Sequence, residues 1–319
     1  MKALLLMLMA GGLACASVPV WIDTDPSVAR GGYEVDDGFA LIQAFRSPAL
    51  SVRGVSVVFG NAPISEAFPI AQRLVRAFGP PGLDVPSGAA SAKDLGVETD
   101  ASRALGSALR REKLVILMLG PATNVATVLR NHPELRKRIK KIVAVAGRRP
   151  NQRFSPSPNA PAFRDFNFEL DPPGFQVLLD ARVPLVLAPW EISSKVWVRR
   201  ADLANLRPSD VSLAWVLDAA EDWLVYWKNS LAAEGFNPFD TLAVGYAISP
   251  DGFRCDRLQV RIEQLPDDTV TGPAAQLKPY LLVDHSMASH HSALYCSEAP
   301  PLFHEMLLKL LAKHESSSP

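Results

Sequence analysis

Apolar residues occur along the chain in two alternating patterns. Short continuous runs such as 114–119 and 142–146 are typical of strands buried on both faces of a parallel sheet. Longer segments such as 67–78, with apolar residues every three or four positions, are typical of amphipathic helices. This alternation predicts an α/β fold, an open and mainly parallel sheet with right-handed crossovers and helices on both faces. We expect strands at 20–22, 52–59, 114–119, 142–146, 184–188, 258–262 and 280–283, and helices beginning near Asp36 and covering 67–78, 99–111, 212–232 and 301–311.

Polar residues follow several of these strands directly. In an open parallel sheet the carboxyl ends of the strands lie on one edge, and ligands bind just outside that edge. The polar residues at the strand ends are Asp23 and Asp25, then Asn61, then Thr123 and Asn124, then Glu191. The sequence therefore predicts one polar rim with a binding site.

Four carboxylates gather where the first strand meets the first helix. Asp23 and Asp25 end the strand, and Asp36 and Asp37 begin the helix. Acids this close repel one another, so a hard cation such as Ca²⁺ or Mg²⁺ among them is the simplest explanation. Aspartates at strand ends and helix starts are also ordinary turn and N-cap residues. An Asp-x-Asp strand end also resembles the nucleophile loop of aspartate-dependent phosphatases, but the Asp36–Asp37 pair follows too soon for that class.

The composition is that of a soluble globular protein. The chain has 319 residues, of which 48% are hydrophobic and 21% charged, and Lys plus Arg equal Asp plus Glu at 33 each. With no net charge, neither nucleic acid nor an anionic membrane surface is an expected partner, and small neutral substrates are favoured. No repeat or linker divides residues 17–319, which we expect to form a single domain.

The first residues have the pattern of a secretory signal. Lys2 precedes the apolar run 3–10, and Ala14-Cys15-Ala16 is a small-x-small cleavage site. The run is too short to span a membrane. We expect residues 1–16 to be removed and the mature chain to be secreted or periplasmic, without a membrane anchor. A lipoprotein anchor at Cys15 is the lesser alternative, because Gly12 stands where such signals usually have Leu.

Two cysteines remain in the mature chain, and two aromatic stretches stand out. Cys255 and Cys296 could pair in an oxidising compartment. The segment 148–171 mixes polar and aromatic residues, and long ordered loops are usually functional. The helix at 212–232 carries several aromatics; of these we expect Trp215 and Trp223 to belong to the core. His285, His290 and His291 are interpreted as loop residues outside the site, because their spacing fits no zinc pattern.

The ordered set of motifs resembles a known family. The set consists of Asp23-Thr24-Asp25-Pro26, Val35-Asp36-Asp37, Gly60-Asn61, Leu119-Gly120-Pro121-Ala122-Thr123-Asn124, Asn159 with Asp165-Phe166-Asn167, and Phe239-Asp240. In order and character it is similar to the inosine-uridine-preferring nucleoside hydrolases, over nearly all of the mature chain. The resemblance implies a Rossmann-like core and a calcium-dependent enzyme of nucleobase salvage. Such an enzyme hydrolyses the N-glycosidic bond of ribonucleosides to ribose and free base, as a homodimer or homotetramer.

The resemblance also implies roles for individual residues. One Ca²⁺ would be bound by the side chains of Asp25, Asp37 and Asp240 and by the backbone carbonyl of Thr123, all oxygen donors. Asp25 would also act as the general base toward the attacking water. Asp23 would support the strand end without binding the metal. The residues implied to bind the ribose are Asp36, Asn61, Asn159, Asp165 and Asn167.

The chain departs from the family pattern at three places. Residues Ser27 to Val35 lengthen the loop before the Asp36–Asp37 pair, and this insert is interpreted either as a lid or substrate contact through Arg30, Tyr33 or Glu34, or as a tolerated surface insertion. Phe239 stands where many members have a His that protonates the leaving base. Asp165 stands where Glu is more frequent.

The change at Phe239 leaves several functions open. Phenylalanine cannot donate a proton, so the base would be held by stacking on Phe239, Tyr226 or Trp227, or protonated by the Tyr226 hydroxyl. The alternatives to nucleoside hydrolysis are a hydrolase of another ribosyl compound and a non-catalytic protein that binds ribose or nucleosides.

Overall fold

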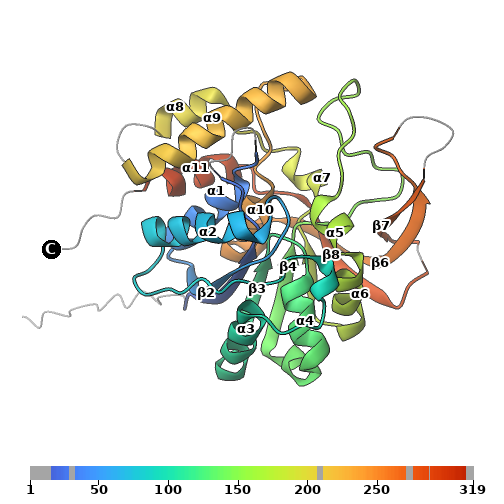
Figure 1. Cartoon of the computed structure of the whole chain (residues 1–319). Helices are drawn as coiled ribbons and strands as arrows, with labels where there is room; N and C mark the ends of the chain where they lie inside the picture. Colours follow the sequence, from blue (N-terminus) through green and yellow to red (C-terminus); the bar gives the residue numbers. More distant parts are fainter. Residues whose placement is uncertain (1–15, 29–32, 207–210, 271–275, 287, 314–319) are drawn as a thin grey trace, which may run out of the picture.

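A central sheet organises the chain in the computed structural model, which describes residues 16–28, 33–206, 211–270, 276–286 and 288–313 (Figure 1). The predicted signal peptide, apart from Ala16, lies outside the described residues, as does the middle of the insert, 29–32. The eight-stranded sheet has the order β2-β1-β3-β4-β5-β8-β6-β7. Its strands are β1 Val18–Thr24, β2 Leu50–Val57, β3 Leu114–Met118, β4 Ile139–Ala144, β5 Leu185–Leu187, β6 Arg254–Pro266, β7 Leu277–Asp284 and β8 His291–Glu298.

The strands from β2 to β8 in this order run parallel, and β6 runs antiparallel to both β8 and β7. The predicted α/β fold with an open, mainly parallel sheet is therefore confirmed. The prediction missed β8 and was wrong to place His291 in a loop, because this residue begins that strand. The reason is that polar residues interrupt the apolar run in β8, so its sequence carries only a weak strand signal.

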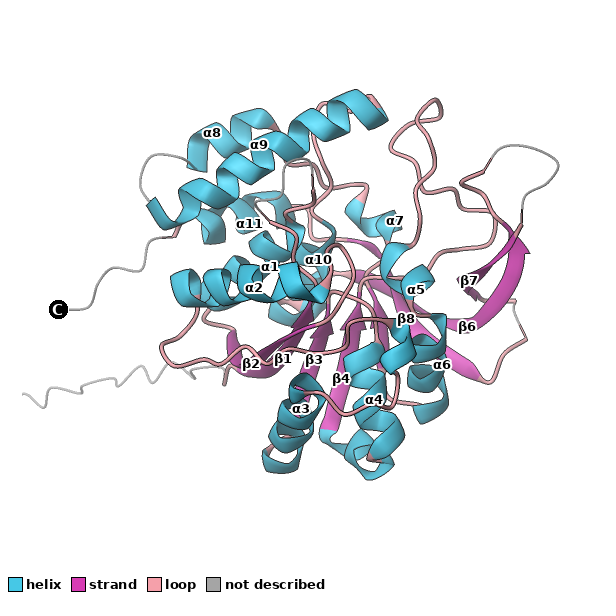
Figure 2. Cartoon of the chain, in the orientation of Figure 1, coloured by secondary structure: helices cyan, strands magenta, loops and turns pink. Residues whose placement is uncertain are grey.

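Helices cover both faces of the sheet (Figure 2). Side chains alternate between the faces along each strand, so that Val20 and Ile22 of β1 join one core cluster while Trp21 joins the other. The first cluster includes residues of α1, α2 and α8–α11, and the second residues of α3, α4 and α6. The helices are α1 Asp36–Arg46, α2 Ile64–Phe78, α3 Asp100–Arg111, α4 Thr123–Asn131, α5 Phe166–Leu170, α6 Pro172–Ala181, α7 Trp190–Ser193, α8 Arg200–Leu206, α9 Val211–Leu231, α10 Phe239–Ile248 and α11 Phe303–Ala312. Among the described residues, none of these helices is both long and apolar enough to cross a membrane.

A disulfide joins Cys255 of β6 to Cys296 of β8, which are direct cross-strand partners. The two cysteines are 41 positions apart in the sequence, so the bond closes a loop that contains β7. In the chain-entropy account, a cross-link of this span stabilises the fold by about 2–4 kcal/mol, because it restricts the unfolded chain.

Replacing both cysteines with serine is therefore expected to lower the free energy of unfolding by about 2–4 kcal/mol. Urea unfolding followed by circular dichroism measures this change. The oxidised wild-type protein should lose the same amount when it is reduced, while the double variant should not respond to the reductant. Equal unfolding midpoints with and without reductant in the wild-type protein would contradict the expected role of the bond.

Candidate active site

The end of β1 places Asp25 in a fully buried position above the sheet edge. One carboxylate oxygen of Asp25 accepts a hydrogen bond from the backbone N–H of Asn61, at 2.8 Å. Gly60 and Gly120 leave the room that this carboxylate occupies. A Cβ atom on Gly60 would lie 1.7 Å from Oδ2 of Asp25, and one on Gly120 would lie 2.8 Å from its Oδ1. Two glycines from other strand ends thus allow the backbone to close around Asp25.

The N-terminus of α1 brings two further acids to the same place. Asp36 and Asp37 form its first turn, where the helix dipole favours negative charge. One carboxylate oxygen of Asp37 accepts hydrogen bonds from the hydroxyl of Thr24 and from the backbone N–H of Asp25, the latter at 3.3 Å. The end of β1 and the start of α1 are therefore joined through Asp37.

Glu34, at the end of the insert, completes this junction. One of its carboxylate oxygens accepts hydrogen bonds from the backbone N–H groups of Asp36 and Asp37, at 3.0 and 3.4 Å. Its other oxygen accepts from the hydroxyl of Ser27 at 2.9 Å. Ser27, Val28 and Val35 are buried, so the insert is packed into the protein where it begins and ends, whereas Tyr33 within it is exposed.

Asp23 lies beside this junction and bonds to structural groups. It is fully buried, and Oδ1 accepts hydrogen bonds from the hydroxyl of Ser56 and, at 2.9 Å, from the side-chain amide of Asn124. Burial raises the pKa of Asp23 to about 7. These bonds tie β1 to β2 and α4, as a residue that supports the strand end would.

Asp240 adds a carboxylate from α10, and oxygens of Glu34, Asp36 and Asp240 lie within 4.8 Å of one another. Burial, followed by repulsion from neighbouring acids, raises the pKa of Asp25, Glu34, Asp37 and Asp240 well above the ordinary range. Burial also raises the pKa of Asp36, to about 6. We call these acids, Asp25, Glu34, Asp36, Asp37 and Asp240, the carboxylate cluster. Within the described part of the chain, no lysine or arginine forms a salt bridge with any of them.

The carboxylate cluster fits a hard divalent cation. Oδ1 of Asp25 and Oδ2 of Asp37 are buried and have no hydrogen-bond partner among the residues that the structure describes. Unpaired buried oxygens are costly, and a cation that prefers carboxylate oxygen would satisfy them. The cluster can therefore hold a metal ion. Thr123 is buried in the first turn of α4, and its hydroxyl donates a hydrogen bond to Asp171 at 2.6 Å. Binding of the metal by the backbone carbonyl of Thr123 therefore stays a prediction.

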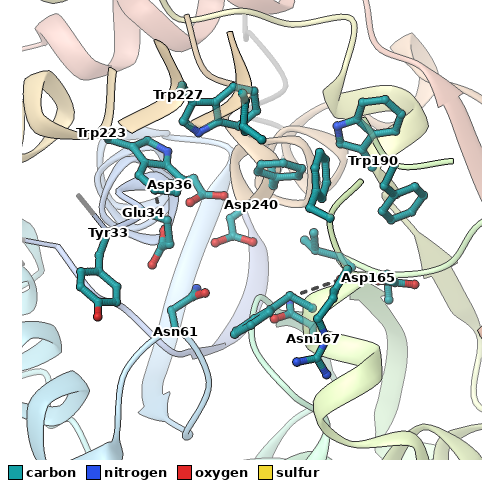
Figure 3. A pocket seen from close by; sticks show the side chains of 18 of the residues that line it. Tyr33, Glu34, Asp36, Asn61, Asp165, Asn167, Trp190, Trp223, Trp227 and Asp240 are labelled. Carbon is teal, nitrogen blue, oxygen red and sulfur yellow. Dashed lines mark hydrogen bonds between the residues drawn. The ribbon is translucent and has the colours of Figure 1, made fainter. Parts of the chain in front are cut away.

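A cavity of about 890 Å³ opens above the carboxylate cluster (Figure 3). Its volume lies within the range of small-molecule sites. Glu34, Asp36 and Asp240 lie together in one wall, with Asn61 below them and Trp223 and Trp227 above, and Trp190 lies across the cavity. The predicted residues that line the cavity are Asp36, Asn61, Asp165, Asn167, Tyr226, Trp227, Phe239 and Asp240.

Asp165 and Asn167 are held at the cavity by backbone groups of the strand ends. The backbone N–H of Gly147 donates to the carboxylate of Asp165 at 2.8 Å, and the side-chain amide of Asn167 donates to the carbonyls of Leu119 and Val145. Burial raises the pKa of Asp165 to about 6, although Arg148 opposes this shift. Both side chains can still offer oxygens to a bound hydroxyl group.

Asn159 does not lie with them. It is exposed and is not among the residues that line the cavity, so in this conformation the predicted contact to ribose is not made. The reason is local: the serines and prolines around it form a turn, and the chain re-enters the protein only at Ala160. The corresponding wall is formed instead by Phe154, Ala162 and Phe163.

A buried arginine supports this side of the cavity. The guanidinium of Arg148 lies 2.6 Å from Asp268, 3.5 Å from Glu169 and 3.9 Å from the ring centroid of Phe154. Lys278 contacts the same two acids, at 2.9 and 3.0 Å. These contacts fix the β6–β7 hairpin against the segment that carries Asp165, and residue Thr269 of that hairpin lines the cavity.

Replacing Arg148 with methionine is expected to lower the free energy of unfolding by about 3 kcal/mol, the low end for breaking a buried pair, because Lys278 still neutralises the acids. The pH below which kcat/KM falls should also move upward, since Arg148 favours the charged form of Asp165. Urea unfolding and a pH profile measure the two effects.

Arg149→Met is the matched control, because it removes a partly exposed ion pair with Glu191. It should lower the free energy of unfolding by about 1 kcal/mol or less and should leave the pH profile of kcat/KM unchanged. A profile that moves equally in both variants would contradict this role of Arg148.

Several lining residues were not predicted. Trp223 packs against the core, as predicted, but it also lines the cavity, which was not predicted. Phe163 and Trp190 were missed as single residues, although the polar-aromatic loop and the strand end before Trp190 both indicated a site. Thr269 gave no signal, because the tip of a hairpin reaches the cavity only through the fold.

Known proteins resemble this chain along most of its length. The sequence profile of the inosine-uridine preferring nucleoside hydrolases matches residues 20–278. A pyrimidine-specific ribonucleoside hydrolase RihA of Klebsiella pneumoniae is 24% identical over 279 residues, covering 77% of this chain and 85% of that protein. An uncharacterized protein of Schizosaccharomyces pombe is 26% identical over 278 residues, covering 76% of this chain and 84% of that protein.

Solved structures share the fold. A plant nucleoside hydrolase, PpNRh1, superposes with a TM-score of 0.75 at 19% identity, covering 93% of this chain and 98% of that chain. A purine-preferring ribonucleoside hydrolase from Gardnerella vaginalis superposes with a TM-score of 0.72 at 18% identity, covering 92% of this chain and 98% of that chain. With the profile match across 20–278, the chain belongs to the inosine-uridine preferring nucleoside hydrolase family and is a hydrolase that acts on N-glycosyl compounds.

Proposed function

We propose that this enzyme hydrolyses ribonucleosides in a calcium-dependent reaction, with Asp25, Asp37, Asp240 and the carbonyl of Thr123 as the metal ligands. The observation that carries the proposal is the buried carboxylate cluster, in which Asp25 and Asp37 have oxygens without a partner among the described residues, while Glu34, Asp36 and Asp240 line a cavity of nucleoside size or larger. Its donors are all oxygen, which Ca²⁺ prefers. When bound, the ion supplies Lewis-acid chemistry that makes a water molecule more acidic.

The chain's own residues divide the remaining work. Asp25 accepts the proton of the attacking water, and the N–H of Asn61 keeps the acceptor oxygen oriented. Asp36, Asn61, Asp165 and Asn167 line the cavity around the place of the sugar and hold its hydroxyl groups. These contacts position the anomeric carbon and stabilise the oxocarbenium-like charge that develops as the glycosidic bond breaks.

A second candidate is a hydrolase of another ribosyl compound. The residues on the leaving-group side of the site depart from the family pattern, whereas those on the sugar side keep it. Phe239 precedes Asp240 and lines the cavity with its ring, and no histidine is among the lining residues that the structure describes. The sugar half would serve any riboside. A binding protein without turnover is the remaining alternative.

We further propose that the mature chain acts outside the cytoplasm, in the periplasm or as a secreted protein. Support comes from the signal-like residues 1–16 and from the Cys255–Cys296 disulfide, which persists in oxidising compartments. A homodimer or homotetramer is proposed on family resemblance.

A reducing-sugar assay over inosine, uridine, adenosine and cytidine tests the proposed function, with bound metal measured on the same sample. We expect release of ribose from at least one nucleoside, and loss of that activity when calcium is removed. Ribose or nucleoside binding without turnover, with calcium at full occupancy, would favour the binding protein and contradict the enzymatic proposal. A cysteine-reactivity measurement and light scattering on secreted protein test the compartment and the oligomeric state.

A further inference from the structure

A continuous arc of aromatic rings lines the cavity, running from beside the carboxylate cluster at Trp223 and Trp227 to Trp190 across from it. Phe154 and Trp190 lie 5.4 Å apart between centroids, Phe163 lies 6.1 Å from Phe239, and Phe239 lies 6.3 Å from Trp227. Trp190 also lies 5.4 Å from Phe163, and Trp223 lies 6.2 Å from Trp227, so each ring contacts the next. Phe163, Trp190, Trp223 and Phe239 are only partly buried and line the cavity. We call the set Phe154, Phe163, Trp190, Trp223, Trp227 and Phe239 the aromatic arc.

The aromatic arc offers no acid to a leaving group. None of its side chains ionises near neutral pH, and within the described residues no histidine lines the cavity. Tyr226 has a hydroxyl, but its ring is stacked on Trp223 with centroids 4.8 Å apart, and 42% of the residue is exposed at the rim. The rings of the arc therefore give no proton to a leaving group.

The charges around the cavity are mostly negative. Among the described residues, the charged ones that line the cavity are the acids Glu34, Asp36, Asp165 and Asp240 and one cation, Arg164. Arg164 is itself paired with Glu169 at 3.0 Å. The faces of the aromatic rings add negative electrostatic potential, and rings arranged in this way bind organic cations. One face of Phe154 is taken by Arg148, which shows that this ring already binds a planar cation.

We propose that the preferred substrates are N-ribosylated aromatic cations, in which a pyridinium-type ring nitrogen is bonded to the anomeric carbon. In this reaction the C1′–N⁺ bond breaks and both electrons go to the ring nitrogen, so the ring leaves as a neutral base. Water forms the new bond at C1′ and gives its proton to Asp25. Protons and electrons therefore balance in this reaction without an acid on the leaving-group side. This inference rests on the proposed function and names the substrate class of the same site.

The cavity also has the room that such a substrate needs. A volume of about 890 Å³ is near the upper end for small-molecule sites, and the lining residues Tyr226 and Phe166 are exposed to solvent. A neutral purine or pyrimidine fits the same space, but it has to leave as an anion unless it is protonated. The arc therefore selects by the charge of the ring rather than by its size.

The test compares 1-(β-D-ribofuranosyl)pyridinium and its 3-carboxamide with inosine and uridine, using the calcium-loaded full mature chain. We expect kcat/KM for the cations to exceed that for both nucleosides by at least roughly tenfold, after correction for uncatalysed hydrolysis. Faster turnover of inosine or uridine than of either cation would overturn the inference and leave the proposed function intact. Absence of turnover on all four substrates and also on adenosine and cytidine would overturn both.

Two variants separate the charge effect from general damage. Phe163→Leu keeps an apolar side chain but removes one ring, and it should lower kcat/KM for the cations by roughly tenfold, the loss of one desolvated cation–π contact, with a smaller loss for the nucleosides. Phe239→His adds a proton donor and removes one phenyl ring of the arc, so it should raise turnover of inosine and lower that of the cations. Equal effects on cationic and neutral substrates in both variants would overturn the inference, and circular dichroism confirms that each variant is folded.

Discussion

Replacing Asp25 with asparagine lowers kcat/KM for the best nucleoside substrate by at least roughly 10³-fold, as expected when a general base is lost together with a metal ligand. The substitution keeps the shape of the side chain but removes its charge. It also places an amide where Oδ2 now accepts from the N–H of Asn61 and Oδ1 is unpartnered. Calcium affinity should therefore fall as well as turnover.

Steady-state kinetics and calcium titration on the same preparations measure the two effects. Asp180→Asn is the matched control, because it makes the same chemical change on an exposed side chain of α6, 63% of which is accessible. It should leave both quantities unchanged. Retention of more than about a tenth of wild-type kcat/KM by Asp25→Asn would show that another group accepts the proton, because a positioned base contributes at least about 10²-fold.

Removal of calcium with EGTA is expected to abolish turnover and to lower the thermal midpoint. A ligand that binds only the folded chain stabilises it by about 2.7 kcal/mol at a hundred times its dissociation constant. Here the ion also relieves repulsion among the buried acids of the carboxylate cluster. Activity and midpoint should return together when Ca²⁺ is added.

Recovery of activity and of the thermal midpoint with Mg²⁺ in place of Ca²⁺ gives a second measurement. Mg²⁺ requires a stricter octahedral arrangement and gives up its waters reluctantly, so it should restore less of both quantities at the same concentration. Full activity in EGTA with an unchanged midpoint would contradict a metal-dependent site. Full recovery with Mg²⁺ alone would contradict the assignment to calcium.

The sequence predicted the parts of the site that depend on local order. Asp25 and Asp37 lie next to each other because a strand end and the following helix start adjoin in any fold of this class. Asp240 could be predicted only through the family resemblance, since it arrives from α10, far along the chain. The alternation of apolar runs was sufficient for the parallel strands, but it did not reveal β8, in which polar residues alternate with buried ones.

The remaining parts of the site depend on how distant segments pack. The sequence left open whether Glu34 is a substrate contact or part of a tolerated surface insertion, and only the structure shows, through its bonds to Ser27 and to the start of α1, that it belongs to the carboxylate cluster. Trp223 was assigned to the core because aromatic residues on a helix usually pack there, and nothing in its spacing reveals a cavity beside α9. Asn159 fits the family motif, but the turn around it carries it to the surface.

The two ends of the insert are fastened by a single carboxylate, and this has a consequence for protein engineering. Because Glu34 holds both Ser27 and the first turn of α1, the attachment points of the loop are fixed independently of the residues between them. A change in the length of the insert between these two ends should therefore leave the neighbouring aspartates in place, since the entropic cost of closing a loop grows only slowly with its length. The residues of the insert can thus be varied to make libraries of altered enzymes, provided that Glu34 itself is kept.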